Sequence, residues 1–229
     1  MRGVAIIGAC ALVLVVAAPA NATRSAQKKP AKCTPGHSHV LVADTQGQVY
    51  EAPTVASLPE TRSFFGCAYG RSKSYRLGIP PLFGSSQGSG GTRLYTLAGP
   101  IVAFEEFATS NLPAGISRDD QVVVRDLRSG RFLHDLPTGT PAAPPENGDV
   151  GVGEIQSLVV KSDGAVAWIV QALETVGGQL ISNYQVHTVD ASGSRVVVSG
   201  REIDPSSLAL AGSTLYWTQG GKPFSATLN

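Results

Sequence analysis

The sequence predicts an all-β fold built from a repeated strand unit, and three observations lead to that prediction. A motif recurs with its spacing preserved, because 22 residues separate Phe104 from Asp126 and 22 residues separate Trp168 from Asp190. A third, shorter copy ends in Trp217. The chain also contains 26 Gly and 15 Pro, enough to end many short strands. Beyond the N-terminal segment, no stretch has the 3.6-residue periodicity of an amphipathic helix, so a repeated hairpin unit is expected.

The N-terminus has the features of a secretory signal peptide over residues 1–22. Arg2 supplies the positive charge, Val4–Ala18 is almost entirely apolar, and Ala20-Asn21-Ala22 is a cleavage signature of small residues. The apolar run is short for a membrane span, which needs about 20 residues. We expect cleavage after Ala22, with an uncleaved anchor as the alternative. Residues 23–35 read as a solvated linker and residues 36–229 as the folded domain.

Two cysteines remain after the signal segment, Cys33 and Cys67. An even number of cysteines in an exported chain favours a disulfide, because exported thiols oxidise. The bridge would hold the incoming N-terminal segment against the first hairpins. Two free buried thiols are the alternative.

From His39 onward, short apolar runs alternate with turns rich in Gly, Asp and Ser. We expect fifteen strands near 39–43, 48–50, 64–69, 74–77, 92–97, 101–107, 121–126, 131–134, 155–161, 165–171, 184–190, 195–199, 208–210, 214–218 and 222–228.

Four consecutive strands, repeated, are typical of the blades of a β-propeller. The predicted fold is therefore a β-propeller-like array of about four small antiparallel blades, with a β-sandwich as the alternative. Structural roles are expected for Phe104, Trp168 and Trp217, which would lie between neighbouring blades, and for Asp126 and Asp190 of the repeated motif. The last unit has three strands, so the first hairpins could complete it and close a ring.

Residues 124–131 and the units around them resemble the blades of secreted bacterial β-propeller-like repeat proteins, including many of unknown function. The resemblance covers residues 36–229 and depends on degenerate motifs, and the Trp-Asp dipeptide of tryptophan–aspartate repeats is missing. It implies a platform that binds proteins or ligands more often than an enzyme.

The charge distribution argues against nucleic-acid binding. The net charge of the whole chain is +1, but residues 1–32 hold five basic residues and no acidic one. The remainder has 13 Lys and Arg against 17 Asp and Glu, a net charge of −4. Nucleic-acid binding needs a concentrated basic face, which a mildly acidic domain does not suggest.

Several patterns suggest chemistry, but each has a simpler structural reading. Gly84-Ser85-Ser86-Gln87-Gly88 matches a hydrolase nucleophile motif, yet it lies in a Gly/Ser-rich loop without the helix that such a serine requires. His37 and His39 lack a third metal ligand and read as a surface pair. A possible Ca²⁺ loop lacks the required spacing; its oxygen ligands would come from Glu146, Asn147, Asp149 and Glu154.

Charged neighbours also read as structural features. The pairs Glu105-Glu106 and Asp119-Asp120 are poor acid/base partners, because adjacent strand residues face opposite ways. Arg71, Lys73 and Arg76 read as solvated charge on one hairpin. The sequence therefore predicts no catalytic residue, no cofactor-binding residue and no metal site.

Two functional classes remain. The first is a secreted, non-catalytic binding or scaffolding domain, extracellular or associated with the cell envelope and monomeric, with an extracellular protein or glycan as its partner and no membrane contact after cleavage. The loops Ile79–Gly91 and Pro137–Gly153 would carry recognition. The second is an exported carbohydrate-active hydrolase or lyase, whose carboxylates would converge from separate blades.

Overall fold

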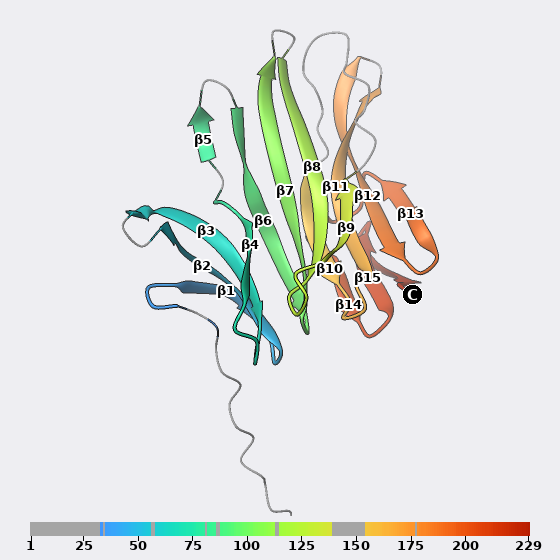
Figure 1. Ribbon diagram of the computed structural model, residues 1–229. Helices are drawn as coiled ribbons and strands as arrows, with labels where there is room; N and C mark the ends of the chain where they lie inside the picture. The colour runs from blue at the N-terminus through green and yellow to red at the C-terminus, as the bar shows by residue number, and fades with distance from the viewer. Residues whose placement is uncertain are drawn as a thin grey trace, which may run out of the picture.

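In the computed structural model, every regular element of the described residues is a β-strand, and the strands form four antiparallel sheets (Figure 1). The described residues are 33, 35–55, 58–80, 82–85, 88–112, 115–138, 154–176 and 178–229. The predicted signal peptide, most of the linker and most of the loop Pro137–Gly153 lie outside them. In the described part of the chain, no helix has the length and apolar character needed to cross a membrane.

Each sheet is a simple meander in which strands that follow one another in sequence pair side by side. Sheet 1 contains β1 (His39–Ala43), β2 (Gly47–Val55), β3 (Leu58–Ala68) and β4 (Ser74–Gly78). Sheet 2 contains β5 (Leu82–Ser85), β6 (Gly88–Ala98), β7 (Ile101–Leu112), β8 (Gly115–Asp126) and β9 (Phe132–Pro137). Sheet 3 contains β10 (Ile155–Val160), β11 (Val166–Val176), β12 (Gln179–Asp190) and β13 (Gly193–Gly200). Sheet 4 contains β14 (Ala209–Ala211), β15 (Thr214–Gln219) and β16 (Lys222–Thr227).

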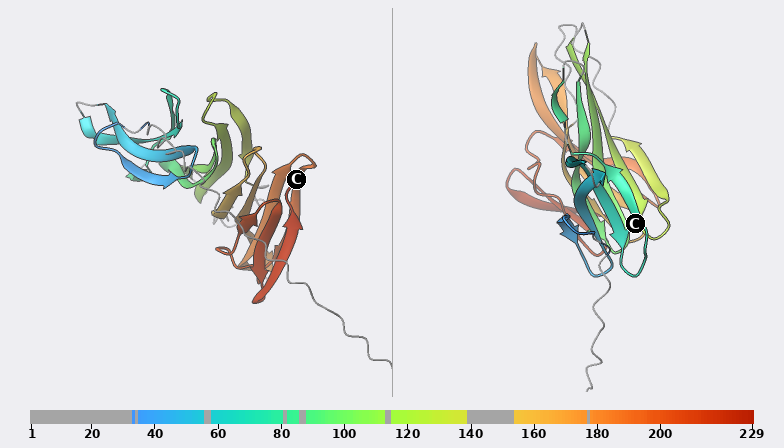
Figure 2. Two further views of the ribbon diagram at one scale, coloured as in Figure 1. Left: turned by 90° about the horizontal axis from the view of Figure 1, so that it is seen from below. Right: turned by 60° about the vertical axis from the view of Figure 1, so that its left-hand side comes forward.

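The sheets stand next to one another in chain order, and the first and last lie at opposite ends of an arc (Figure 2). β1 contacts β6, β6 contacts β10, and β10 contacts β14, so each sheet touches the next one along the chain. The all-β fold and the antiparallel sheets are confirmed, and four sheets in series are not a two-sheet sandwich.

The expectation of a closed ring is wrong. β1 pairs within sheet 1, and sheet 4 keeps three strands of its own. The two ends also differ chemically. The outer face of sheet 1 buries Tyr50 and Ala52 beside Cys33, whereas Tyr216 and Ser225 pair on the outer face of sheet 4. Both side chains are exposed and carry a hydroxyl group, and an end face that water can solvate does not need another sheet to cover it.

Strand β5 was not predicted, because the stretch around it reads as a Gly/Ser loop. It pairs with β6 and gives sheet 2 a fifth strand. The β7–β8 and β11–β12 hairpins are also longer than predicted.

Three apolar clusters hold the sheets together, one at each interface, and strand alternation explains them. On β7, Phe104 faces sheet 1 while Ala103 faces sheet 3. On β11, Trp168 faces sheet 2 while Ala167 faces sheet 4. Trp217 on β15 then faces sheet 3. Each buried aromatic therefore packs against the preceding sheet, and an alanine on the neighbouring strand position leaves room for the next aromatic.

Trp168 is the largest fully buried side chain, with 2% of its surface exposed. Its indole N–H donates to the Thr138 carbonyl at 3.1 Å, and its ring stacks on His187 with 5.2 Å between ring centroids. His187 is itself buried and bonds Gln185 at 2.9 Å through Nε2. Burial lowers the pKa of His187 to about 4.

The predicted disulfide joins Cys33 to Cys67, with 6.3 Å between the Cα atoms. Cys67 is fully buried beside Tyr50 and Ala52 on the outer face of sheet 1. The bridge therefore ties the N-terminal segment to the outer face of sheet 1, where these apolar side chains are buried.

Replacing Trp168 with Ala should lower the free energy of unfolding by about 3–5 kcal/mol, because the change empties a large buried site between sheets 2 and 3. Urea unfolding followed by circular dichroism measures this loss. Tyr216→Ala is the matched control, since this aromatic is 43% exposed and should cost about 1 kcal/mol or less. Equal losses for the two variants would contradict the interface described above.

Breaking the disulfide with Cys33→Ala should cost about 3–4 kcal/mol, as expected for a crosslink that spans 34 residues. Cys33 is only partly buried, so this variant removes the bridge and leaves the core side chains in place. Peptide mapping without reductant should recover the two cysteines in one linked fragment. Recovery of both as free thiols would show that the bridge does not form.

Stability should fall as the pH drops from about 6.5 to 4, by about 1.4 kcal/mol per pH unit once His187 titrates in the unfolded chain. The unfolded chain binds a proton on this imidazole in that window, and the folded chain does not. His187→Phe keeps an aromatic ring on Trp168 and should flatten this part of the curve. Urea midpoints measured across the pH range test it; an unchanged slope in the variant would assign the effect to another group.

Candidate functional site

The described cavities lie along the junction of sheets 1 and 2, which we call the seam groove. One has a volume of about 490 Å³ and is lined by β4, β6 and β7, with Arg76, Thr92 and Glu106 as its polar residues. The other has a volume of about 380 Å³ and is lined mainly by apolar and aromatic residues, including Phe64 and Tyr95. Thr92 lines both, so the two cavities adjoin.

The groove forms because β4 approaches β6 closely. Gly78 makes this possible, since a Cβ atom at this position would overlap with the Thr92 side chain. Thr92 in turn joins the sheets: its N–H donates to the Ile79 carbonyl at 3.0 Å, and its hydroxyl donates to the same oxygen at 3.2 Å. The backbone at Gly78 and Ile79 and the small side chain of Thr92 therefore line the groove.

A β-bulge in β6 shapes the second cavity. The register shifts between Arg93 and Thr96, and Leu94 has a φ of 56°, an uncommon conformation for a non-glycine residue. The extra residue turns Leu94 toward the sheet 2–sheet 3 cluster and Tyr95 toward sheet 1. Tyr95 then contacts the ring of Phe64 edge-on at 5.1 Å, and its hydroxyl bonds that of Thr92. Burial raises the pKa of the Tyr95 phenol, so it stays neutral.

The two neighbouring glutamates of β7 have different surroundings, as the alternation of strand residues predicts. Glu105 is fully buried on the sheet 3 side, where it accepts a hydrogen bond from Arg93 at 2.9 Å. Glu106 faces the seam groove. Partial burial, together with the charge of Asp135, raises the pKa of Glu106.

Arg93 joins sheets 2 and 3 through a second carboxylate. Its Nη1 lies 2.6 Å from Glu154 Oε1, and Nη2 reaches the Ile155 carbonyl at 3.5 Å. Glu154, considered in the sequence as a calcium ligand, is therefore paired with an arginine. The other three oxygen ligands of that candidate, Glu146, Asn147 and Asp149, lie outside the described residues.

The remaining candidates do not assemble into a catalytic centre within the described ranges. Ser85 belongs to β5, and Ser86 lies outside the described residues. His37 and His39 are not part of any described group of three or more metal-ligating side chains. Asp120 is buried and Asp119 is exposed, again on opposite sides of a strand.

The motif aspartates hold turns. Asp126 accepts hydrogen bonds from the Arg128 N–H and the Ser129 hydroxyl, each at 2.8 Å. Asp190 accepts bonds from Arg195 at 2.8 and 3.0 Å and from the Asn229 N–H at 2.9 Å. The guanidinium of Arg195 holds the pKa of Asp190 well below its usual range. Asp190 thereby ties sheet 3 to Asn229, which follows β16 of sheet 4.

Sequence reasoning missed the residues that define the groove, Thr92, Leu94 and Tyr95. Their role depends on a bulge and on the approach of a strand from another sheet, and neither leaves a local signature. The Gly-rich stretch Ile79–Gly91, expected to carry recognition, does contribute Ile79, Gly90 and Gly91 to the lining.

Comparisons with known proteins identify no relative. No family model matches the chain. No curated protein and no solved structure matches it either. The resemblance of the sequence to secreted bacterial β-propeller-like repeat proteins therefore stays a prediction, and the seam groove is interpreted from its own geometry.

Proposed function

We propose that this chain is a secreted, non-catalytic binding domain, built as an open propeller-like platform, and that its ligand is an extracellular glycan held in the seam groove. The observation that supports this proposal is the pairing of two adjoining cavities of different character. One offers the polar side chains of Arg76, Thr92 and Glu106, and the other offers the apolar surface around Phe64 and Tyr95. A sugar ring has hydroxyl groups at its edge and C–H groups on its faces, which suits such a combination.

The size of the groove favours a small ligand or a few sugar units over a folded protein. Ligand sites commonly enclose about 300–1,000 Å³, a range that includes both cavities. A stable protein interface instead covers about 800 Å² on each partner and is usually flatter. Hairpins also provide a rigid frame, so little ordering is required when a ligand binds.

A hydrolase is the second candidate, and the observation that favours it concerns Glu106. A carboxyl group with a raised pKa can act as a general acid, and the charge of Asp135 contributes to the shift. Glycosidases place two carboxylates about 5–9 Å apart around the scissile bond. Among the described residues that line the polar cavity, Glu106 supplies the single carboxylate, which is why binding is the preferred function.

A glycan array followed by calorimetry on the best ligand tests the proposal. Arg76→Ala and Glu106→Gln should each weaken binding by about tenfold, the loss expected when a charged hydrogen bond worth about 1.4 kcal/mol is removed. Lys222→Ala, an exposed charge on sheet 4, is the control and should bind as the unmodified chain does.

Two outcomes would overturn the proposal. One is unchanged affinity in both groove variants, which would place the ligand elsewhere. The other is release of new reducing ends from a bound glycan that stops in Glu106→Gln, which would replace the binding domain with a hydrolase.

A further inference from the structure

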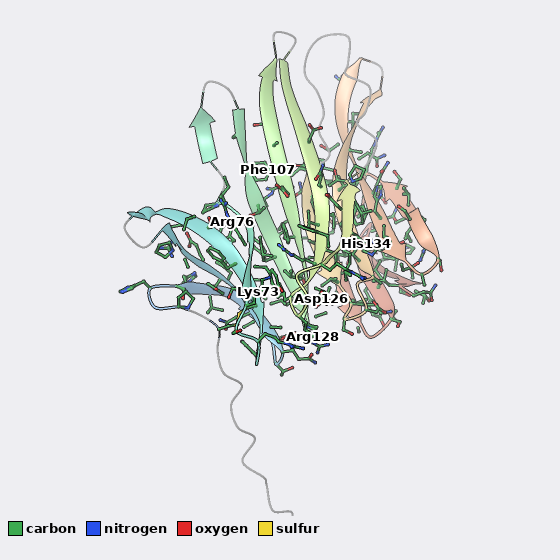
Figure 3. All side chains as sticks on the ribbon, in the orientation of Figure 1. Lys73, Arg76, Phe107, Asp126, Arg128 and His134 are labelled. Carbon is green, nitrogen blue, oxygen red and sulfur yellow. A yellow bond between two sulfur atoms is a disulfide. The ribbon has the colours of Figure 1, made fainter. Side chains whose placement is uncertain are left out.

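A second surface lies at the lower end of the same junction, where the β3–β4 turn of sheet 1 meets the β8–β9 turn of sheet 2. Figure 3 shows Lys73, Asp126 and Arg128 gathered there, below Arg76. We call this the basic turn surface. It consists of five cationic residues, Arg71, Lys73, Arg125, Arg128 and Arg131, and one exposed aromatic, Phe132.

An arginine held between two aromatic rings forms its centre. The guanidinium carbon of Arg125 lies 4.8 Å from the ring centroid of Tyr75 and 4.6 Å from that of Phe132. Its Nε donates to the Gly130 carbonyl at 2.8 Å and its Nη1 to the Arg76 carbonyl at 2.9 Å. The arginine therefore bonds backbone of both sheets, and its position is fixed before any ligand arrives.

The two turns also interlock. Gly130 has a φ of 76°, and a Cβ atom at this position would overlap with the ring of Tyr75. The same Tyr75 ring also contacts Lys73, whose Nζ lies 5.0 Å from the ring centroid. Arg128 reaches across to Gln46 of the β1–β2 turn at 2.7 Å. The cations are thus presented on a rigid surface built from both sheets.

Asp126 and Asp44, the two carboxylates in these turns, are bonded by groups other than the side chains of the exposed cations. Asp126 is bonded by Arg128 N–H and the Ser129 hydroxyl, and Asp44 is bonded by backbone N–H groups, including that of Gly99 at 2.6 Å. Within the described ranges, Arg71, Lys73 and Arg131 form no salt bridge. Within the turns, five cations against two carboxylates leave an excess of positive charge.

This excess contrasts with the rest of the domain. Without these five cations and two carboxylates, the chain after residue 32 holds 8 Lys and Arg against 15 Asp and Glu. A rigid positive surface on an otherwise acidic protein favours a ligand with negative charge that follows the surface locally. A long nucleic acid would extend over the acidic remainder, where repulsion acts over about 8–10 Å at ordinary salt concentrations.

We infer that the basic turn surface binds the anionic groups of a polysaccharide whose chain continues into the seam groove. β4 connects the two places, with Lys73 before its first residue and Gly78 in the groove lining. Its five residues span about 16 Å. Phe132, which is 56% exposed, offers an apolar face beside the fixed arginine for a sugar ring. This inference rests on the proposed glycan binding and specifies its chemical class.

Binding of the mature chain to polygalacturonate and to its fully methyl-esterified form tests the inference, because the two polymers share a backbone and differ in charge. The acidic polymer should bind at least tenfold more tightly, and the difference should shrink as salt is raised. Poly(glycerol phosphate) in a parallel titration distinguishes a phosphate-bearing chain from a carboxylate-bearing one. The double variant Arg71→Ala/Lys73→Ala should lose about tenfold in affinity for the acidic polymer and nothing for the ester.

Arg201→Ala/Lys222→Ala removes the same charge far from the junction and should leave both affinities unchanged. Equal binding of acid and ester would overturn the anionic class while leaving the groove proposal intact. Binding of none of the three polymers would overturn the anionic class as well, and the glycan array then decides the groove proposal separately. Tighter binding of a single-stranded oligonucleotide of equal charge, lost in the same double variant, would replace the polysaccharide with a nucleic acid.

Discussion

The contact between one large aromatic side chain and the preceding sheet is the interaction on which this fold depends. A single repeated meander cannot bury its apolar face by itself, so the sheets gain stability by stacking against their neighbours. Phe104, Trp168 and Trp217 each fill an interface, and Ala103 and Ala167 provide space on the opposite faces of their strands. A small residue next to a large one therefore lets sheets 2 and 3 each pack an aromatic side chain against the preceding sheet and receive one from the next sheet.

The same arrangement leaves two end faces, and the chain protects them by different means. At the N-terminal end, apolar residues such as Tyr50 are buried beside a disulfide-linked segment. At the C-terminal end, the outer face carries Tyr216 and Ser225, which water can solvate. Ring closure would have buried both faces against each other, and hydroxyl groups on one of them would then have lost hydrogen bonds to water.

The elements that could be predicted from the sequence are those with a local cause. Alternating apolar residues around Phe104 and Trp168 specify strands, and Asp126 and Asp190 specify turns through hydrogen bonds to nearby N–H groups. The opposite orientations of Glu105 and Glu106 follow from the same alternation. The remainder depends on distant partners. The approach of Gly78 to Thr92, the stacking of Tyr75 on Arg125 and the pairing of Arg93 with Glu154 join residues whose distance in sequence gives no signal. β5 is hidden for another reason, since Gly and Ser carry little strand preference.

The open ends give the array a direction along which it can come apart. In a chain of sheets that contact only their neighbours, local unfolding begins at the end with the fewest constraints and proceeds inward. Sheet 4 has three strands and one neighbour, whereas sheet 1 is crosslinked to the segment that precedes it. Amide hydrogens of β14–β16 would therefore exchange through openings that leave sheets 1 and 2 joined. The groove and the basic turns belong to the part of the molecule that such openings do not reach, so both surfaces keep their structure while the C-terminal sheet fluctuates.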